Sequence, residues 1–208
     1  MGQDSKGLGY MDDRLVKYLT HYRAARADDL PALEAEIWEA YGVERAVIAL
    51  DMSGFSRLTD RRGILHFLSL IQDMREITRP IVEAGGGEIV KYEADNMFAV
   101  APSADMAFDL SAAIVTQTAA GNRERTEDAR IDVSIGIDFG RLLLIPGVEL
   151  FGAPVNFACK LGEDVARPGE ILITGNAYAL LSGGRGAGAG RDRHDVGGIP
   201  VEIRSIGP

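Results

Sequence analysis

The order of the apolar segments constrains the fold of this chain more than any other feature of its sequence. Short apolar runs of strand length occupy residues 45–51, 88–93, 97–101 and 131–137. Apolar side chains recur at helical spacing over residues 59–84, between the first two runs, and over residues 103–120, between the last two. The order strand, helix, strand, strand, helix, strand is that of the split βαβ motif, so we predict an α+β domain with a ferredoxin-like sheet.

Local signals set the ends of these elements. The glycines at 85–87 end the first long helix, and Pro80 inside it is expected to kink or shorten it. Residues 94–96 form a tight turn between the second and third strands, because Asn96 tolerates turn conformations. Ser103 is the expected cap of the second long helix.

The C-terminal part continues with shorter elements. We expect further strands at 141–145, 170–174 and 199–206, the last at a sheet edge, and helices at 153–164 and 176–182. The segment 183–198 is too rich in glycine for regular structure, and we predict a mobile loop there.

An N-terminal extension precedes the predicted domain. Residues 1–11 are expected to form a flexible tail, and residues 12–24 and 29–41 are predicted helices. We therefore divide the chain into a tail and helical extension, 1–43, and a main domain, 44–208.

The second of these helices carries an apolar stripe. Leu30, Leu33, Ile37 and Tyr41 recur at helical spacing and lie on one of its faces. We expect this stripe to pack into a core, and a contact with a second copy of the chain is the alternative.

Composition limits the partners of this chain. It has 22 Lys and Arg against 31 Asp and Glu, a net charge of −9, and no dense basic cluster. We therefore expect no nucleic-acid and no membrane partner, although a local site for a phosphorylated ligand stays open. Cys159 is the single cysteine, which fits a reducing compartment, and the N-terminus has no apolar signal region. These features predict a cytoplasmic, unanchored protein.

Two aspartates are predicted to meet at one end of the sheet. In the run IALDMSGFSRLTD, residues 48–60, a hydrophobic strand ends at Asp51. Asp95 lies in the turn of the next hairpin. Like charges so close together repel, whereas a pair of divalent cations removes the repulsion and gives the carboxylates a purpose. The alternative is an Asp51 that caps local structure and an Asp95 that only favours the turn.

The backbone after Asp51 offers a place for phosphate. Ser53, Gly54, Phe55 and Ser56 form a turn that leads into the long helix. Exposed amides in such a turn suit anion binding. We therefore predict that these four residues contact the phosphates of a ligand.

Four motifs together resemble those of one known family. LDMSGFSRL resembles the first metal motif of the class III nucleotide cyclase catalytic domains, which are the adenylyl and guanylyl cyclases. GGEIVKYEADNMFAVAP resembles their hairpin, with Ala94-Asp95 where a Gly-Asp pair is usual. VSIGIDFG resembles their next strand, and FGAPVNFACKLGEDVARPGEILIT resembles their catalytic helix and the strand after it. The resemblance covers residues 44–182, and the order and spacing of the four motifs make it specific.

This resemblance implies an enzyme of the phosphorus–oxygen lyase class. In the family, the ribose 3′-hydroxyl of a nucleoside triphosphate attacks the α-phosphorus, and pyrophosphate leaves. Two Mg²⁺ or Mn²⁺ ions activate the hydroxyl and neutralise the phosphates. By resemblance, Asp51, Asp95 and the Met52 carbonyl bind both ions.

The resemblance also implies a pair of residues that recognises the base. Lys91 falls where adenylyl cyclases have a base-recognising Lys, and Glu149, counted back from Asn156, falls where they have an Asp. A Lys donor and a carboxylate acceptor complement N1 and the N6 amine of adenine, whereas guanylyl cyclases typically have Glu and Cys there. The segment between Gly140 and Phe151 is shorter than in relatives, which leaves the Glu149 assignment open. The alternative is a solvated Lys and a solvated Glu on strand ends.

Asn156 and Lys160 lie four residues apart on a predicted helix and so share a face. In the family, this Asn orients the ribose, and the residue four positions later is an Arg that steadies charge on the reacting phosphorus. Lys160 keeps the charge of that Arg but not its planar fork. Glu93, two residues before Asp95, stands where the family usually has an apolar residue, and it adds negative charge near the metals or points to solvent.

The family's sites lie at the interface of a head-to-tail dimer, so the resemblance implies a homodimer. One chain would supply the two aspartates, and the other Lys91, Glu149, Asn156 and Lys160. We predict conversion of ATP to cyclic AMP and pyrophosphate. Three alternatives stay open. They are a cyclase of another base, including a pyrimidine, a catalytically weak cyclase-homology domain that binds nucleotide or a partner, and a purely structural dimerisation domain.

Overall fold

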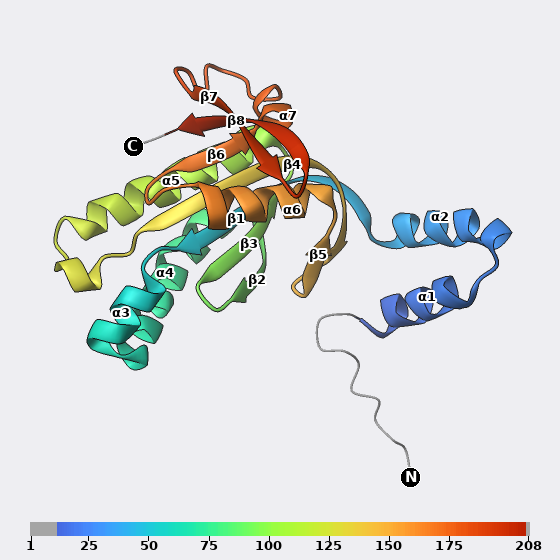
Figure 1. Cartoon of the computed structure of the whole chain (residues 1–208), viewed down its shortest axis with the longest axis horizontal. Coiled ribbons are helices and arrows are strands. Elements are labelled where there is room, and N and C mark those ends of the chain that lie inside the picture. Colours follow the sequence, from blue (N-terminus) through green and yellow to red (C-terminus); the bar gives the residue numbers. More distant parts are fainter. Residues whose placement is uncertain (1–11, 207–208) are drawn as a thin grey trace, which may run out of the picture.

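The structure is a computed structural model that describes residues 12–206, with the side chains of residues 55 and 56 outside that description. The expected tail at residues 1–11 therefore lies outside the described residues. A pair of helices leads into a domain built on one mixed sheet (Figure 1). The elements are α1 (Asp13–Ala24), η1 (Ala27–Asp29), α2 (Leu30–Tyr41), β1 (Gly42–Met52), α3 (Phe55–Arg62), α4 (Ile64–Ala84), β2 (Glu88–Glu93), β3 (Asn96–Ala101), α5 (Ala104–Asn122), η2 (Glu127–Ala129), β4 (Val133–Ile145), β5 (Glu149–Phe151), α6 (Ala153–Cys159), the π-helical segment η3 (Lys160–Val165), β6 (Ile171–Thr174), α7 (Gly175–Tyr178), β7 (Gly190–Val196) and β8 (Ile199–Ile206).

The strand order confirms the predicted ferredoxin-like core. The sheet runs β2-β3-β1-β4-β6-β8-β7, and β5 pairs with β4 off this path. Strand β1 is antiparallel to both β3 and β4, and the helices α4 and α5 form the two crossovers. The first four strands therefore have the split βαβ arrangement, and β6, β8 and β7 extend the sheet beyond β4.

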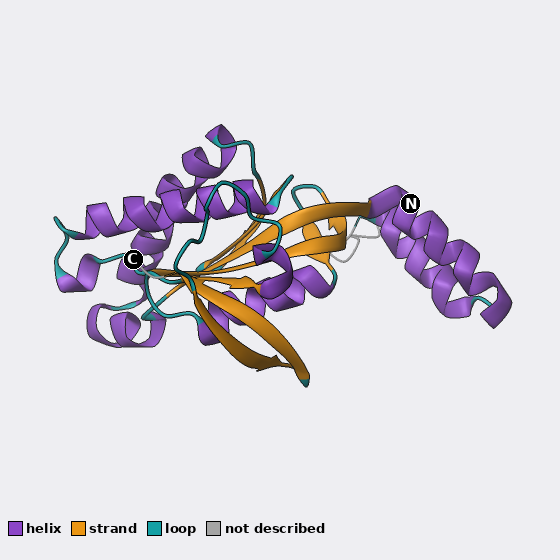
Figure 2. Cartoon of the chain, turned by 90° about the horizontal axis from the view of Figure 1, so that it is seen from above, coloured by secondary structure: helices purple, strands orange, loops and turns teal. Residues whose placement is uncertain are grey.

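The central strand is buried on both of its faces. Ile48 and Leu50 belong to the core that the sheet forms with α4 and α5, whereas Val47 and Ala49 belong to a second core that it forms with α6. Figure 2 shows helices on both sides of the sheet. Packing on both faces fixes the end of β1, which carries Asp51.

The long helix predicted over residues 59–84 is two helices. Gly63 lies between α3 and α4 with a φ of 84°, a left-handed conformation that ends the first helix. Pro80 lies inside α4, which continues past it to Ala84. The break is therefore at Gly63, and the prediction that Pro80 would shorten the helix was wrong. The stop at the glycines 85–87 and the Ser103 cap, which accepts from the Met106 amide, are confirmed.

Three predictions for the C-terminal part were also wrong. Residues 141–145 are not a separate strand, because β4 runs without a break from Val133 to Ile145. Residues 190–196 of the expected loop at 183–198 form strand β7. Its exposed polar residues gave no apolar signal, but each of its residues pairs with a residue of β8. Strand β8 lies between β6 and β7, so β7 and not β8 is at the edge.

The N-terminal helices form an antiparallel pair that projects from the domain (Figures 1 and 2). Asp12 caps α1 by accepting from the Leu15 amide, and it also accepts from the Tyr41 hydroxyl at 2.8 Å. Leu33, Ile37 and Tyr41 are buried within the chain, which confirms core packing for most of the stripe on α2. Among the described helices, none combines the length and hydrophobicity that a membrane-spanning segment needs.

Candidate active site

The two predicted metal-binding aspartates lie close enough to influence each other. Asp51 is near the end of β1, opposite Ser134 of β4, and Asp95 is in the turn between β2 and β3. Burial raises the pKa of Asp51 to about 7, and the negative charge of Asp95 contributes to the rise. The Ala94 carbonyl in the same turn accepts from Arg75 at 3.0 Å, which fixes the turn.

Asn96 ties this turn to the strand end. With its amide nitrogen turned toward β1, Asn96 donates to Asp51 Oδ1 at 2.8 Å and to the Leu50 carbonyl at 3.3 Å. The sequence analysis treated Asn96 only as a turn residue. Its contact depends on the pairing of β3 with β1, which no local pattern reports.

The donor set suits a hard divalent cation. After burial, the groups that raise the pKa of Asp51 most are other carboxylates, Asp95 and Glu163. Carboxylate and backbone carbonyl oxygens, here with the Met52 carbonyl, are the ligands that Mg²⁺ and Mn²⁺ take. In the described part of the chain, no group of three or more His, Cys, Asp or Glu side chains is placed to hold a metal ion. The chemistry of the aspartate pair fits such an ion.

The turn predicted to hold phosphate is only partly available. The Ser53 amide donates to the Asp132 carbonyl at 2.9 Å, so this amide is already used, and the contact of Ser53 with phosphate stays a prediction. Gly54 has a φ of 97° and precedes the first turn of α3, where helix amides have no intrahelical acceptor. Phe55 and Ser56 begin α3, and their side chains lie outside the description.

Lys91 and Glu149 meet as a pair. Lys91 Nζ donates to Glu149 Oε2 at 2.8 Å and to Glu93 Oε2 at 2.6 Å, and it lies 5.1 Å from the centre of the Phe98 ring. Only 23% of the Lys91 side chain and 13% of the Glu149 side chain are exposed. The alternative of two separately solvated charges was therefore wrong. Glu93, for which metal charge and solvent were the two expected roles, has a side chain that is 65% exposed, and it is also a partner of Lys91.

One further residue joins this pair. Burial raises the pKa of the Cys159 thiol to about 12, and the charges of Lys91 and Glu149 both act on it. Cys159 therefore lies near Lys91 and Glu149. The sequence had shown it only as the single cysteine, because its neighbours come from β2 and β5.

Asn156 and Lys160 line one cavity, as their spacing predicts. The cavity measures about 410 Å³, and its other wall is the tip of the β7–β8 hairpin, with Val196, Gly197 and Ile199. Lys160 is the one charged residue among the described residues that line it, and it pairs with Asp164. The sequence analysis missed this hairpin, although the Gly-Gly pair between two apolar residues is a turn signal that indicates it.

The predicted site residues thus form three groups. They are Asp51 with Asp95, Lys91 with Glu149, and Asn156 with Lys160. Among the described residues, no hydrogen bond or ion pair joins one group to another.

Comparison with known proteins identifies a common fold and homologous sequences. No family model matches the chain. The putative adenylate cyclase 3 of Rhizobium meliloti (strain 1021) is 30% identical over 138 residues, which are 66% of this chain and 23% of that protein. A crystal structure of an adenylate/guanylate cyclase/hydrolase from Silicibacter pomeroyi matches 80% of this chain and 98% of its own with a TM-score of 0.70 and 27% identity. This chain is a homologue of the class III nucleotide cyclase catalytic domains, and it has their fold.

Two more matches agree with this result. The adenylate cyclase of Streptomyces coelicolor is 28% identical over 136 residues, which are 65% of this chain and 34% of that protein. The adenylyl cyclase CyaB from P. aeruginosa shares the fold, with a TM-score of 0.64 at 19% identity over 80% of this chain and 96% of its own. The chain spans about a quarter of the length of the Rhizobium meliloti relative and about a third of the length of the Streptomyces coelicolor relative.

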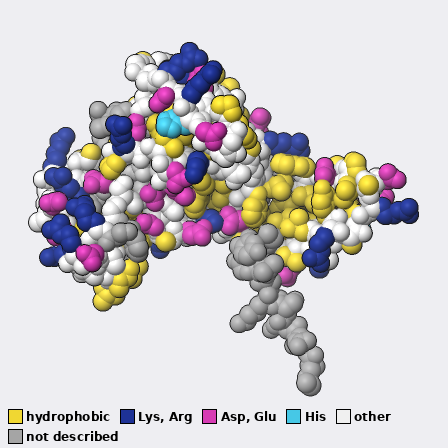
Figure 3. Space-filling model, in the orientation of Figure 1, with side chains coloured by type: hydrophobic (Ala, Val, Ile, Leu, Met, Phe, Trp, Pro, Cys, Tyr) yellow, Lys and Arg dark blue, Asp and Glu magenta, His cyan; other side chains and the backbone are white. Residues whose placement is uncertain are grey.

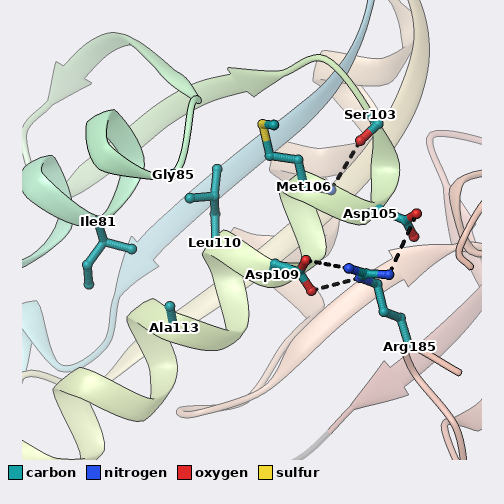
Figure 4. A pocket seen from close by; sticks show the side chains of 9 residues that line it. All are labelled: Ile81, Gly85, Ser103, Asp105, Met106, Asp109, Leu110, Ala113 and Arg185. Atoms are coloured by element: carbon teal, nitrogen blue, oxygen red, sulfur yellow. Dashed lines mark hydrogen bonds and ion pairs between the residues drawn. The ribbon is translucent and has the colours of Figure 1, made fainter. Parts of the chain in front are cut away.

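A second cavity of this cyclase-like domain lies apart from the candidate site. It measures about 470 Å³, and α4, α5 and Arg185 line it. Figure 4 shows Arg185 turned toward Asp105 and Asp109 of α5, and two of its nitrogens donate to Asp109, each at 2.8 Å. None of the predicted site residues lines this cavity. The charged residues that do line it, Arg185, Asp105 and Asp109, form ion pairs with one another.

Proposed function

We propose that this chain is a nucleotide cyclase that converts a nucleoside triphosphate, in the first place ATP, into a 3′,5′-cyclic nucleotide and pyrophosphate. The observation that carries the proposal is the pair Asp51 and Asp95 at the end of a fully packed strand, where the charged groups that act most on Asp51 are other carboxylates. Two carboxylates this close repel each other and do not stabilise the fold unless a cation binds to both. Similarity to proteins named adenylate cyclase supports the same reaction.

The aspartates and the Met52 carbonyl would hold two divalent cations, Mg²⁺ or Mn²⁺. Bound there, these ions supply the activation of the ribose 3′-hydroxyl and the neutralisation of the phosphates. The chain contributes fixed positions: Asn96 holds Asp51, and Arg75 holds the turn that carries Asp95. Amides at the beginning of α3 would donate hydrogen bonds to phosphate oxygens.

Lys91 and Glu149 would recognise the base. Adenine and cytosine both present a ring nitrogen that accepts beside an amine that donates, so an ammonium and a carboxylate match either edge. Guanine and uracil instead present a ring nitrogen that donates beside a carbonyl that accepts. We place ATP first because the named relatives are adenylate cyclases, and a pyrimidine substrate is the alternative that the pair also fits.

Asn156 and Lys160 would act on the ribose and the phosphates. An amide can accept from and donate to a sugar hydroxyl, and an ammonium stabilises charge that develops on the transferring phosphorus. Lys160 is paired with Asp164 in the free chain, so it must exchange this carboxylate for phosphate when substrate binds. This need supports a second candidate, a domain that binds nucleotide and turns it over slowly.

A homodimer would complete the site. Within the described part of one chain, no hydrogen bond or ion pair joins the aspartate pair to the Lys91–Glu149 or Asn156–Lys160 group. Two chains related by a twofold axis present the aspartates of each to the other groups of its partner, which gives two equivalent sites.

The deciding experiment uses the purified chain with each of the four nucleoside triphosphates and Mn²⁺. The product is identified by mass, and Asp51→Asn serves as the matched control because it keeps the shape of the side chain. We expect a cyclic nucleotide from the parent and none from Asp51→Asn. Nucleotide binding without any cyclic product favours the binding-domain alternative, and neither binding nor product contradicts the proposal.

A further inference from the structure

The helix pair α1–α2 packs on the hairpin that carries the base-recognition carboxylate. An apolar cluster, here called the junction cluster, joins the pair to the end of β4 and to β5. Its members are Leu15, Ile37, Tyr41 and Ile145, and Val148 and Phe151 pack against it. Figure 3 shows hydrophobic side chains gathered over the extension and its junction with the domain.

Strand β5 depends on this packing for its position. It has three residues, it pairs with β4 alone, and so backbone hydrogen bonds hold it on one side only. Leu150 packs into the core beneath α6, whereas Val148 and Phe151 pack against the junction cluster. Glu149 lies between these residues, so its position is set by apolar contacts on both sides of a short strand.

The helix pair is itself firmly attached to the domain. Helix α2 ends at Tyr41 and β1 begins at Gly42, so no linker separates them. The Tyr41 hydroxyl donates to both carboxylate oxygens of Asp12, at 2.8 and 2.9 Å, which joins the beginning of α1 to the end of α2. The Arg141 guanidinium of β4 lies 4.2 Å from the centre of the Trp38 ring. A change in the angle of the pair is therefore transmitted to the β4–β5 hairpin.

We propose that the α1–α2 pair is a positioning element for base recognition, and that it acts through the junction cluster on Glu149. The pair keeps β5 where Glu149 Oε2 meets Lys91, and the Glu149 Oε1 atom accepts from the Leu150 amide at 3.0 Å. Any partner or segment that shifts the pair would alter the choice of base before it alters the phosphate end. The role of Glu149 in this inference rests on the proposed function, whereas the contact between the pair and β5 does not.

The test weakens the junction cluster from the helix side. Ile37→Ala removes buried side-chain volume next to β4 and β5, whereas Ile37→Val keeps most of that volume and should behave like the parent. Leu33→Ala is the matched control, because Leu33 is equally buried on α2 but lies outside the junction cluster. Calorimetry with Mn²⁺ and each of the four triphosphates measures discrimination. We expect Ile37→Ala to weaken binding of the preferred triphosphate about fivefold and that of the poorest by less than about twofold.

A second readout does not depend on nucleotide. Hydrogen–deuterium exchange of the peptide 146–151 should be faster in Ile37→Ala than in the parent and unchanged in Leu33→Ala. Val148→Ala, a small change from the strand side, should reproduce both effects if Ile37→Ala does not fold. A parent that binds no triphosphate contradicts the proposed function, while exchange still tests the contact. Equal discrimination in parent and Ile37→Ala, or a parent that binds all four triphosphates alike, overturns the positioning role.

Discussion

Replacing Asp51 with Asn distinguishes a carboxylate kept for function from one that caps the fold. The pKa of Asp51 rises from 3.8 to about 7 in the folded chain, first through burial and then through the charge of Asp95. A raised pKa means that Asp51 favours folding most when it is protonated. This contribution is complete below pH 3.8 and is lost as the pH rises through about 7.

The magnitude follows from the shift. Each pKa unit corresponds to about 1.4 kcal/mol, so a shift of about 3 units sets an upper limit of about 4 kcal/mol. Asp51 is only half-buried, and screening by solvent reduces the expected effect to about 2 kcal/mol. Above pH 7, Asp51→Asn should therefore be more stable than the parent by about 2 kcal/mol, because Asn carries no charge and still offers an oxygen to Asn96.

Urea unfolding with a chelator, followed by circular dichroism at about pH 5 and about pH 8, measures this difference. Adding Mn²⁺ should then stabilise the parent and leave Asp51→Asn unchanged. Asp138→Asn is the control, since Asp138 is a buried aspartate of β4 that accepts from Thr174 and lies outside the pair. It should respond to Mn²⁺ as the parent does. If Asp51→Asn is the less stable protein at about pH 8 without metal, Asp51 is a structural cap and the reasoning fails.

Four other predictions test the site and the fold. Mixing Asp95→Asn chains with Asn156→Ala chains should restore about a quarter of parental activity, since half of the dimers are mixed and each has one intact site; no recovery in verified mixed dimers contradicts the shared site. Lys160→Arg should raise turnover about tenfold by offering two parallel hydrogen bonds, and Lys160→Ala should lower kcat with little change in KM, as steady-state kinetics will show. Gly63→Ala should cost about 1 kcal/mol in urea unfolding, because an added Cβ meets no atom but φ stays at 84°. A chelator should abolish triphosphate binding measured by calorimetry, and binding that persists argues against the metal pair.

Much of the fold follows from local signals in the sequence. The hairpin turn that carries Asp95 and the apolar strand that ends on Asp51 are each encoded within a few residues, and the topology then brings them together. The apolar positions that predict the long helix, from Ile64 to Ile77, all follow Gly63, so the polar residues 59–62 and Gly63 itself are the local signal of the break that was missed. Strand β7 was missed because its stability comes from backbone pairing with β8, which exposed polar side chains do not report.

The contacts that shape the site depend on segments far apart in the sequence. Lys91 and Glu149 are 58 positions apart, and they meet only because a three-residue strand packs between two apolar clusters. The acceptor of the Ser53 amide is the Asp132 carbonyl, which no pattern around either residue predicts. Sequence spacing could place residues on a helix or strand. It could not show which of their polar groups are already hydrogen-bonded within the chain.

The distribution of charge links the metal and nucleotide ends of the site. Lys91 and Lys160 each have a carboxylate partner in the chain, whereas Asp51 has mainly other carboxylates, Asp95 among them, as charged neighbours. A triphosphate is an anion, so it gains from Lys160 only by displacing Asp164. Under the proposed function, we expect most of the attraction to come from divalent cations bound at the aspartate pair. Nucleotide affinity should therefore depend on divalent ions even if Lys160 makes the catalytic step slow.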